Sequence, residues 1–203
     1  MSGSFIARRR FLASAGLALA GGGRAAAADK PKVAIRTNHG TIVVELEIER
    51  APITSANLLR YVDTRKYDGG TFYRANRTPG APKEGTIVGG PALKAHRFPP
   101  IAHEPTTKTG LRHVAGAIAL GRYAPGTATG DFYICASDEP YLDAHPGAKG
   151  DNLGFAVFGQ VVSGMETVHV ILGLPTPGKS PFKAQQGQWL DPVVPIYAMR
   201  RTA

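Results

Sequence analysis

Short apolar runs separated by glycine-containing turns recur along most of the chain, and this pattern constrains the fold more than any other feature. In residues 32–47, β-branched residues alternate with polar ones on both sides of Asn38-His39-Gly40. Alternation with a period of two indicates a half-buried strand, and the turn between two such runs predicts a hairpin. Further strands are predicted at 71–76, 85–90, 114–122, 131–137, 154–164 (one bent strand or a pair) and 194–201.

Two helices interrupt the strands. Pro52 suits the first position of a helix, and Ser55, Leu58, Leu59 and Val62 then share one helical face. Met165, Val168 and Leu172 indicate a second, late helix. About eight short strands with two helices predict a mainly β fold in one domain. The fold is either a closed barrel, with the helices capping its ends, or a sandwich.

Three segments lack any period and are predicted to be irregular. Residues 77–84 contain two prolines and a glycine, and residues 91–110 are rich in proline and threonine. Residues 175–195 are rich in proline, and we expect an extended excursion before the last strand.

The first 28 residues are typical of an export signal. Arg8 and Arg9 precede Phe11 and Leu12, a short apolar run follows, and small residues lead to Ala28. This order predicts a twin-arginine-type signal peptide over 1–28 and a mature domain over 29–203, with an ordinary secretory leader or an uncleaved anchor as the alternatives. The apolar run is too short to span a bilayer. We therefore expect a periplasmic protein without stable membrane insertion after cleavage.

Charge and motifs exclude several classes of function. The net charge is +9, but the leader contributes four arginines and the other basic residues are scattered, which favours solubility over nucleic-acid binding. Cys135, the single cysteine, lies in an apolar run, so we expect a buried thiol and no internal disulfide. The histidines show no metal-ligand spacing, and the motifs of common hydrolases and nucleotide-binding sites are absent. We expect no metal or cofactor, and a monomer.

Arg74 stands in the middle of the predicted strand "TFYRANR". Alternation would place Phe72 and Arg74 on one face, and an edge strand with a solvent-exposed arginine would account for this. One reaction would also need only an arginine among apolar side chains. Rotation about an X-Pro bond has a barrier of roughly 18–20 kcal/mol from amide resonance. A donor to the prolyl nitrogen binds the twisted transition state better than the planar ground state.

The segments "GTIVVELEIERAPITSANLLRYVDTRKYDGGTFYR", "GAIALGR", "TATGDFYI" and "GFAVFGQVVSGMETVHVI" occur in this order. Together they resemble the cyclophilins, the cyclophilin-type peptidyl-prolyl cis-trans isomerases, from about Lys32 to Arg200. The resemblance implies a closed eight-stranded antiparallel barrel capped by two α-helices. It also implies proline-containing polypeptides as partners and Arg74 as the catalytic residue. The implied substrate-binding residues are Phe72, Thr86, Val88, Gly121, Asp131, Phe132, Tyr133, Tyr141, Leu142 and Phe155.

Some positions depart from the family pattern. Val88 and Asp131 stand where the family has glutamines, and Gly85 and Thr86 replace a pocket Phe and Met. Asp131 could pair with Arg74 and either orient it or weaken it as a donor. We therefore predict a slower or differently selective isomerase that acts on exported proteins during folding. The alternative is a non-catalytic module of the same fold that binds proline-containing segments.

Overall fold

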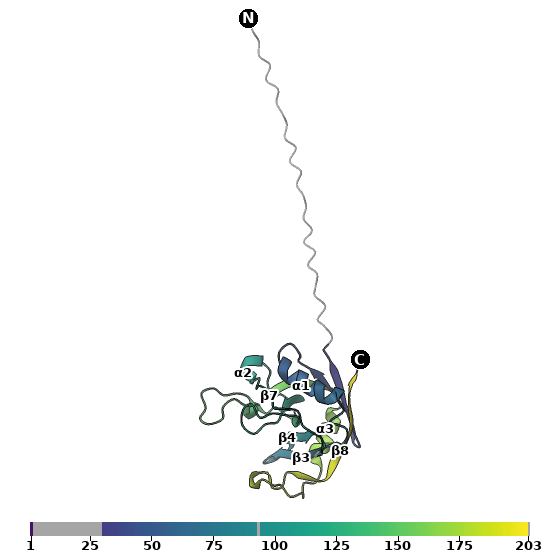
Figure 1. Ribbon diagram of the computed structural model, residues 1–203. Helices are drawn as coiled ribbons and strands as arrows, with labels where there is room; N and C mark the ends of the chain where they lie inside the picture. Colours follow the sequence, from purple (N-terminus) through teal and green to yellow (C-terminus); the bar gives the residue numbers. More distant parts are fainter. Residues whose placement is uncertain (2–29, 93, 203) are drawn as a thin grey trace.

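A closed barrel of eight antiparallel strands forms the body of the molecule in the computed structural model, which describes Met1 and residues 30–92 and 94–202 (Figure 1). The strands follow each other around the barrel in the order β1-β2-β7-β5-β6-β4-β3-β8. Their bounds are β1 Lys32–Thr37, β2 Gly40–Leu46, β3 Gly70–Thr78, β4 Ala81–Gly90, β5 Ala117–Leu120, β6 Phe132–Cys135, β7 Ala156–Ser163 and β8 Trp189–Thr202. The predicted barrel is confirmed, and the sandwich is excluded. Apart from Met1, the predicted signal peptide lies outside the described residues.

The interior of the barrel follows from the alternation seen in the sequence. In the first hairpin, Val33 lies opposite Val44 and Ile35 opposite Ile42, and all four side chains are fully buried. Because successive side chains point to opposite faces of a strand, the residues between them face outward. The first hairpin thus contributes one continuous wall of the core.

Two helices cover the barrel as predicted, and a third is a single turn. The bounds are α1 Pro52–Asp63, α2 Thr106–Thr109 and α3 Met165–Gly173, with 3-10 turns η1 Pro140–Leu142 and η2 Lys183–Gln185. The predicted inner face of α1 is buried, as are Val168 and Leu172 of α3. In Figure 1, α1 lies near the top of the barrel and α3 lies lower, among β3, β4 and β8. The helices therefore cover different parts of the barrel.

The predicted loop at residues 77–84 is wrong. Strand β3 continues to Thr78 and β4 begins at Ala81, so the two strands form a hairpin around Pro79-Gly80. Gly80 adopts a positive φ of 81° in this turn, a conformation that favours glycine. Pro82 is tolerated because β6 pairs only with residues 86–89 of β4, so no ladder partner on that side needs its missing N–H.

Strand β8 begins earlier than the sequence predicts and contains a wide irregularity. It starts at Trp189, so the extended excursion from Pro175 ends about seven residues sooner than Pro195. Trp189 lies opposite Arg74 of β3, and Val194 lies opposite Phe72. Four residues of β8, 190–193, therefore lie opposite Tyr73 without regular pairing to β3. This irregularity in β8 lies next to Arg74.

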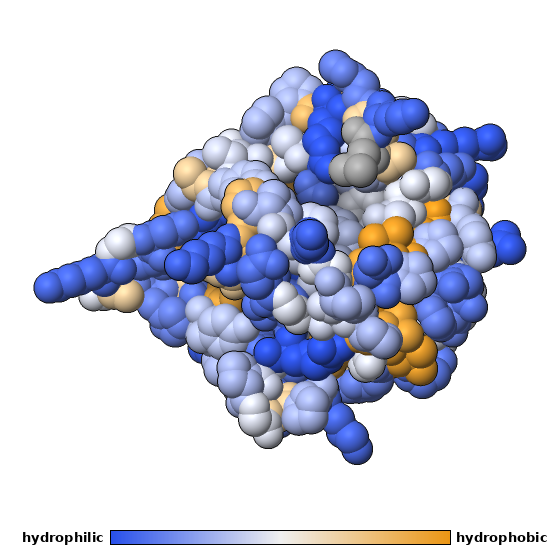
Figure 2. All heavy atoms as spheres, turned by 90° about the horizontal axis from the view of Figure 1, so that it is seen from below, coloured by the Kyte–Doolittle hydropathy of each residue, from blue (hydrophilic) through white to orange (hydrophobic). Residues whose placement is uncertain are grey.

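One face of the molecule is mostly polar. Figure 2 shows that hydrophilic side chains predominate on it and that hydrophobic ones gather in smaller patches. Within the described ranges, no helix is long and apolar enough to cross a membrane.

Candidate active site

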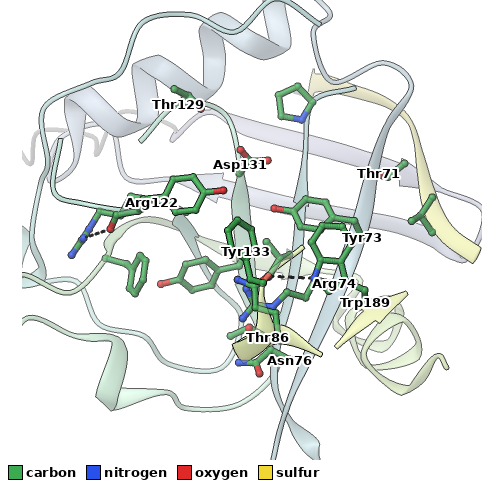
Figure 3. Close-up of a pocket in the computed structure, with 18 of the residues that line it drawn as sticks. Thr71, Tyr73, Arg74, Asn76, Thr86, Arg122, Thr129, Asp131, Tyr133 and Trp189 are labelled. Carbon is green, nitrogen blue, oxygen red and sulfur yellow. Dashed lines mark hydrogen bonds between the residues drawn. The ribbon is translucent and has the colours of Figure 1, made fainter. Parts of the chain in front are cut away.

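A cavity of about 740 Å³ opens beside β3, β4 and β6, and Arg74 lies in its wall (Figure 3). Nine of the predicted site residues line it: Arg74, Thr86, Val88, Gly121, Asp131, Tyr133, Tyr141, Leu142 and Phe155. These residues come from positions 74–155 of the chain, and the barrel brings them together because β3, β4 and β6 are consecutive neighbours in the sheet.

A β-bulge directs Arg74 into this cavity. The register of β3 shifts between Phe72 and Arg74 against both β4 and β8. Phe72 and Ala75 are buried in the core, whereas Tyr73 and Arg74 both line the cavity. The expectation that Phe72 and Arg74 share a face is wrong, because the extra residue of a bulge reverses the alternation.

Arg74 is a partly buried cation. Strand β3 has neighbours on both sides, so the edge-strand explanation of this arginine is wrong. Its Nε is buried and, among the described residues, has no hydrogen-bond partner. Burial lowers the pKa of Arg74, and the nearby Tyr73 and Tyr141 oppose that effect. This N–H is therefore a hydrogen-bond donor that no described protein group uses.

The pairing of Asp131 with Arg74 is also wrong. Asp131 Oδ2 accepts a hydrogen bond of 2.6 Å from Arg97 Nη1, and Oδ1 accepts one of 3.3 Å from Arg97 Nη2. Arg97 comes from the irregular segment after β4, which no local pattern relates to β6. Because the carboxylate is engaged by this second arginine, Asp131 neither orients nor weakens Arg74 directly.

The part of the cavity beyond Arg74 is apolar and aromatic. Tyr133 of β6 meets Phe155 edge-on, with ring centroids 5.6 Å apart and an interplanar angle of 88°. Val88 lies opposite Tyr133 in the sheet and Leu142 contributes from η1. The Tyr133 hydroxyl lies 2.9 Å from Nε2 of the buried His113. This part of the cavity is therefore suited to a compact apolar ring.

Two predicted binding residues do not reach the cavity. Phe72 and Phe132 are fully buried in the barrel core and are absent from the cavity lining. Their rings pack edge-on at 5.7 Å. They lie on the inner side of β3 and β6, and they support the cavity wall from within.

The sequence reasoning missed a second wall, formed by the segment before β8 and by Trp189, the first residue of β8. Trp189 packs against Tyr73 with ring centroids 5.2 Å apart, and its Nε1 donates to Gln185 Oε1 over 3.2 Å (Figure 3). The ring centroids of Phe182 and Tyr123 lie 6.1 Å apart, and Tyr123 follows β5. Trp189 is the single tryptophan of the chain, a signal that could have drawn attention to it. Within the described part of the chain, no three His, Cys, Asp or Glu side chains cluster as potential metal ligands.

Comparison with known proteins identifies the family. The family model for "Cyclophilin type peptidyl-prolyl cis-trans isomerase/CLD" matches residues 32–187, well over half of the chain. The chain belongs to the cyclophilin family. This cyclophilin is 31% identical over 159 residues to peptidyl-prolyl cis-trans isomerase A of Dickeya dadantii, which covers 78% of this chain and 80% of the relative. It is 30% identical over 153 residues to peptidyl-prolyl cis-trans isomerase B of Escherichia coli, with 71% and 85% covered.

Solved structures agree on the fold. A cyclophilin-type peptidyl-prolyl cis-trans isomerase of Cryptosporidium parvum superposes with a TM-score of 0.63 at 18% identity, over 86% of this chain and 98% of that chain. This cyclophilin is accordingly a peptidyl-prolyl cis-trans isomerase, and the non-catalytic module is not favoured.

Proposed function

We propose that this isomerase accelerates X-Pro rotation by donating a hydrogen bond from Arg74 to the prolyl nitrogen. As the amide twists, its resonance is lost and the nitrogen regains a lone pair. A donor in a partly buried site stabilises that lone pair in the transition state and contributes little to the planar ground state. The observation that supports this role is the buried Arg74 Nε, which lacks a partner among the described residues and lies in the cavity wall.

The apolar part of the cavity is the proposed proline pocket. Val88, Tyr133, Leu142 and Phe155 would hold the pyrrolidine ring while the acyl side turns. Because the prolyl side of the bond is held in place, only the acyl side has to rotate. A solved Cryptosporidium parvum relative was crystallised in the presence of the dipeptide Ala-Pro, which supports a proline-containing ligand for this one.

A pair of arginine variants tests the donor role. We expect Arg74→Ala to lower kcat/KM about 100-fold, the usual range for loss of one donor to a transition state. Arg74→Lys should recover only part of the rate, because an ammonium lacks the planar fork of a guanidinium. Arg201→Ala, which removes an exposed arginine paired with Asp63, serves as the matched control and should keep the wild-type rate.

A protease-coupled proline-peptide assay and a proline-limited refolding assay provide the measurement. Equal rates for the wild type and Arg74→Ala would disprove the donor role. Binding of a proline peptide without acceleration by the wild type would instead favour the non-catalytic module.

We also propose that the protein is exported and acts on exported polypeptides. The support is the arrangement of Arg8, Arg9 and the following apolar run in the sequence. Cell fractionation of the full chain should place it in the periplasm, and replacing both arginines with lysine should retain it in the cytoplasm. Export that survives this replacement would favour an ordinary secretory leader.

A further inference from the structure

Behind the proposed proline pocket lies a buried polar chain that the isomerase reaction, as described so far, does not use. The Tyr133 hydroxyl lies 2.9 Å from His113 Nε2, and His113 Nδ1 lies 2.7 Å from Asp143 Oδ1. The His113 side chain is completely buried, and that of Asp143 is 8% exposed. Three polar groups buried beside an apolar pocket are costly unless each hydrogen bond is made.

The chemistry of the three groups determines the direction of each hydrogen bond. An ionised carboxylate only accepts, so Nδ1 of His113 carries the proton that it donates to Asp143. Nε2 then holds a lone pair and accepts from the Tyr133 hydroxyl. Burial raises the pKa of Tyr133, which keeps its hydroxyl protonated as the donor. The hydroxyl hydrogen is thereby held in the bond to His113 and is not available to the pocket.

The chain links two walls of the pocket. Tyr133 belongs to β6, and Asp143 directly follows Leu142 of η1, which lines the same cavity. Asp143 also accepts from the backbone N–H of His113 over 3.1 Å, so His113 is held at both its ring and its backbone. His113 itself lies between α2 and β5. The His113 ring therefore connects Tyr133 of β6 to Asp143, which follows η1, through one hydrogen bond on each side.

Burial favours a neutral His113 ring, and the charges around it favour the protonated one. Burial is the largest influence and lowers its pKa, while Asp143 and Glu139 act in the opposite direction. Glu139 donates its backbone N–H to the His113 carbonyl over 2.7 Å, and its carboxylate accepts from Ser137. Arg112 lies 3.7 Å from Asp143 and partly offsets that carboxylate. Tyr133 also contacts the ring, through its hydroxyl and through stacking at 5.9 Å between ring centroids.

We propose that His113 is a positioning residue of the isomerase, which holds the Tyr133 ring and the Leu142 wall in place through the Tyr133–His113–Asp143 chain. The proposal rests on the proposed proline pocket. It explains how this chain carries a tyrosine in an apolar pocket, because the Tyr133 hydroxyl is hydrogen-bonded to His113 and not exposed to the pocket. It also predicts that acid weakens substrate binding, because a protonated Nε2 becomes a donor and the Tyr133 hydroxyl must turn away from it.

A double-mutant cycle tests the coupling. His113→Leu removes the acceptor and should raise KM about 5- to 10-fold while kcat changes less than twofold, because Arg74 is untouched. In a Tyr133→Phe background, the same His113→Leu change should raise KM less than twofold, because the hydroxyl it serves is already gone. An equal effect in both backgrounds would overturn the proposal.

The pH profile supplies a readout that a purely structural role would not move. With an uncharged proline peptide, kcat/KM of the wild type should fall in acid, at a pH below the ordinary histidine pKa of about 6.5, because burial lowers the pKa of His113. The fall should be absent in Tyr133→Phe, and its persistence there would contradict the proposal.

A second variant keeps the test decisive if His113→Leu fails to fold. Asp143→Ala removes the acceptor of the Nδ1 proton, so His113 can adopt the other tautomer, in which Nε2 donates, and KM should rise as it does in His113→Leu. An unchanged KM in Asp143→Ala would also overturn the inference. The Arg74→Ala variant separates the two proposals: loss of activity there with no His113–Tyr133 coupling refutes only the positioning role.

Discussion

Glu104 gives the sharpest prediction about stability, because it caps a helix fifty residues away in the sequence. Helix α1 begins at Pro52, and its N-cap residue, Ala51, has no side chain that can accept a hydrogen bond. The buried Glu104 takes that role: its carboxylate accepts from the N–H of Ile53 at 3.2 Å, the N–H of Thr54 at 2.8 Å and the hydroxyl of Thr54 at 2.7 Å. A negative charge also interacts favourably with the N-terminal end of a helix.

The expected change in the free energy of unfolding follows from these contacts. Hydrogen bonds to a charged group contribute about 1.5–3 kcal/mol each, and two of the three are shorter than 3 Å. Glu104→Ala should therefore lower the free energy of unfolding by about 3–5 kcal/mol, a large share of the roughly 5–15 kcal/mol of a typical domain. Glu104→Gln keeps one acceptor and the side-chain volume, so it should lose about half as much as Glu104→Ala.

Urea unfolding followed by the fluorescence of Trp189, the single tryptophan, measures both variants. Glu166→Ala is the matched control, because Glu166 lies exposed in the first turn of α3 and should change stability by less than about 1 kcal/mol. If Glu104→Ala lost no more than Glu166→Ala, the capping role would be refuted.

Two further predictions concern stability. Arg77 donates to the carbonyls of Leu172 and Leu174 at the end of α3. Arg77→Ala should therefore lower the free energy of unfolding by about 2 kcal/mol, and Arg77→Lys by less, in the same urea experiment. Equal losses in the two variants would argue against carbonyl capping. Because burial lowers the pKa of His113 below its unfolded value, the unfolded state binds the proton first, and stability should fall as the pH drops below about 6.5. In His113→Gln this loss should be smaller between pH 7 and pH 5, and identical curves would show that His113 does not contribute.

The sequence by itself determined the architecture. The alternation in residues 32–46 and the helical spacing from Ser55 to Val62 are local periods, and both were found with the predicted faces buried. The ordered family segments also pointed to Arg74 and to eight further residues that line the cavity. Local periods can be read from the chain because each depends only on neighbours a few residues apart.

Only the tertiary structure decided which residues of the site contact one another and which side chains enter the cavity. The bulge at Tyr73 sends Arg74 into the cavity and leaves Phe72 in the core, since one extra residue reverses the faces of a strand. Asp131 is bound by Arg97, and Tyr133 by His113, across 34 and 20 residues respectively. Such partners depend on strand register and on the path of irregular segments, and no local period records either.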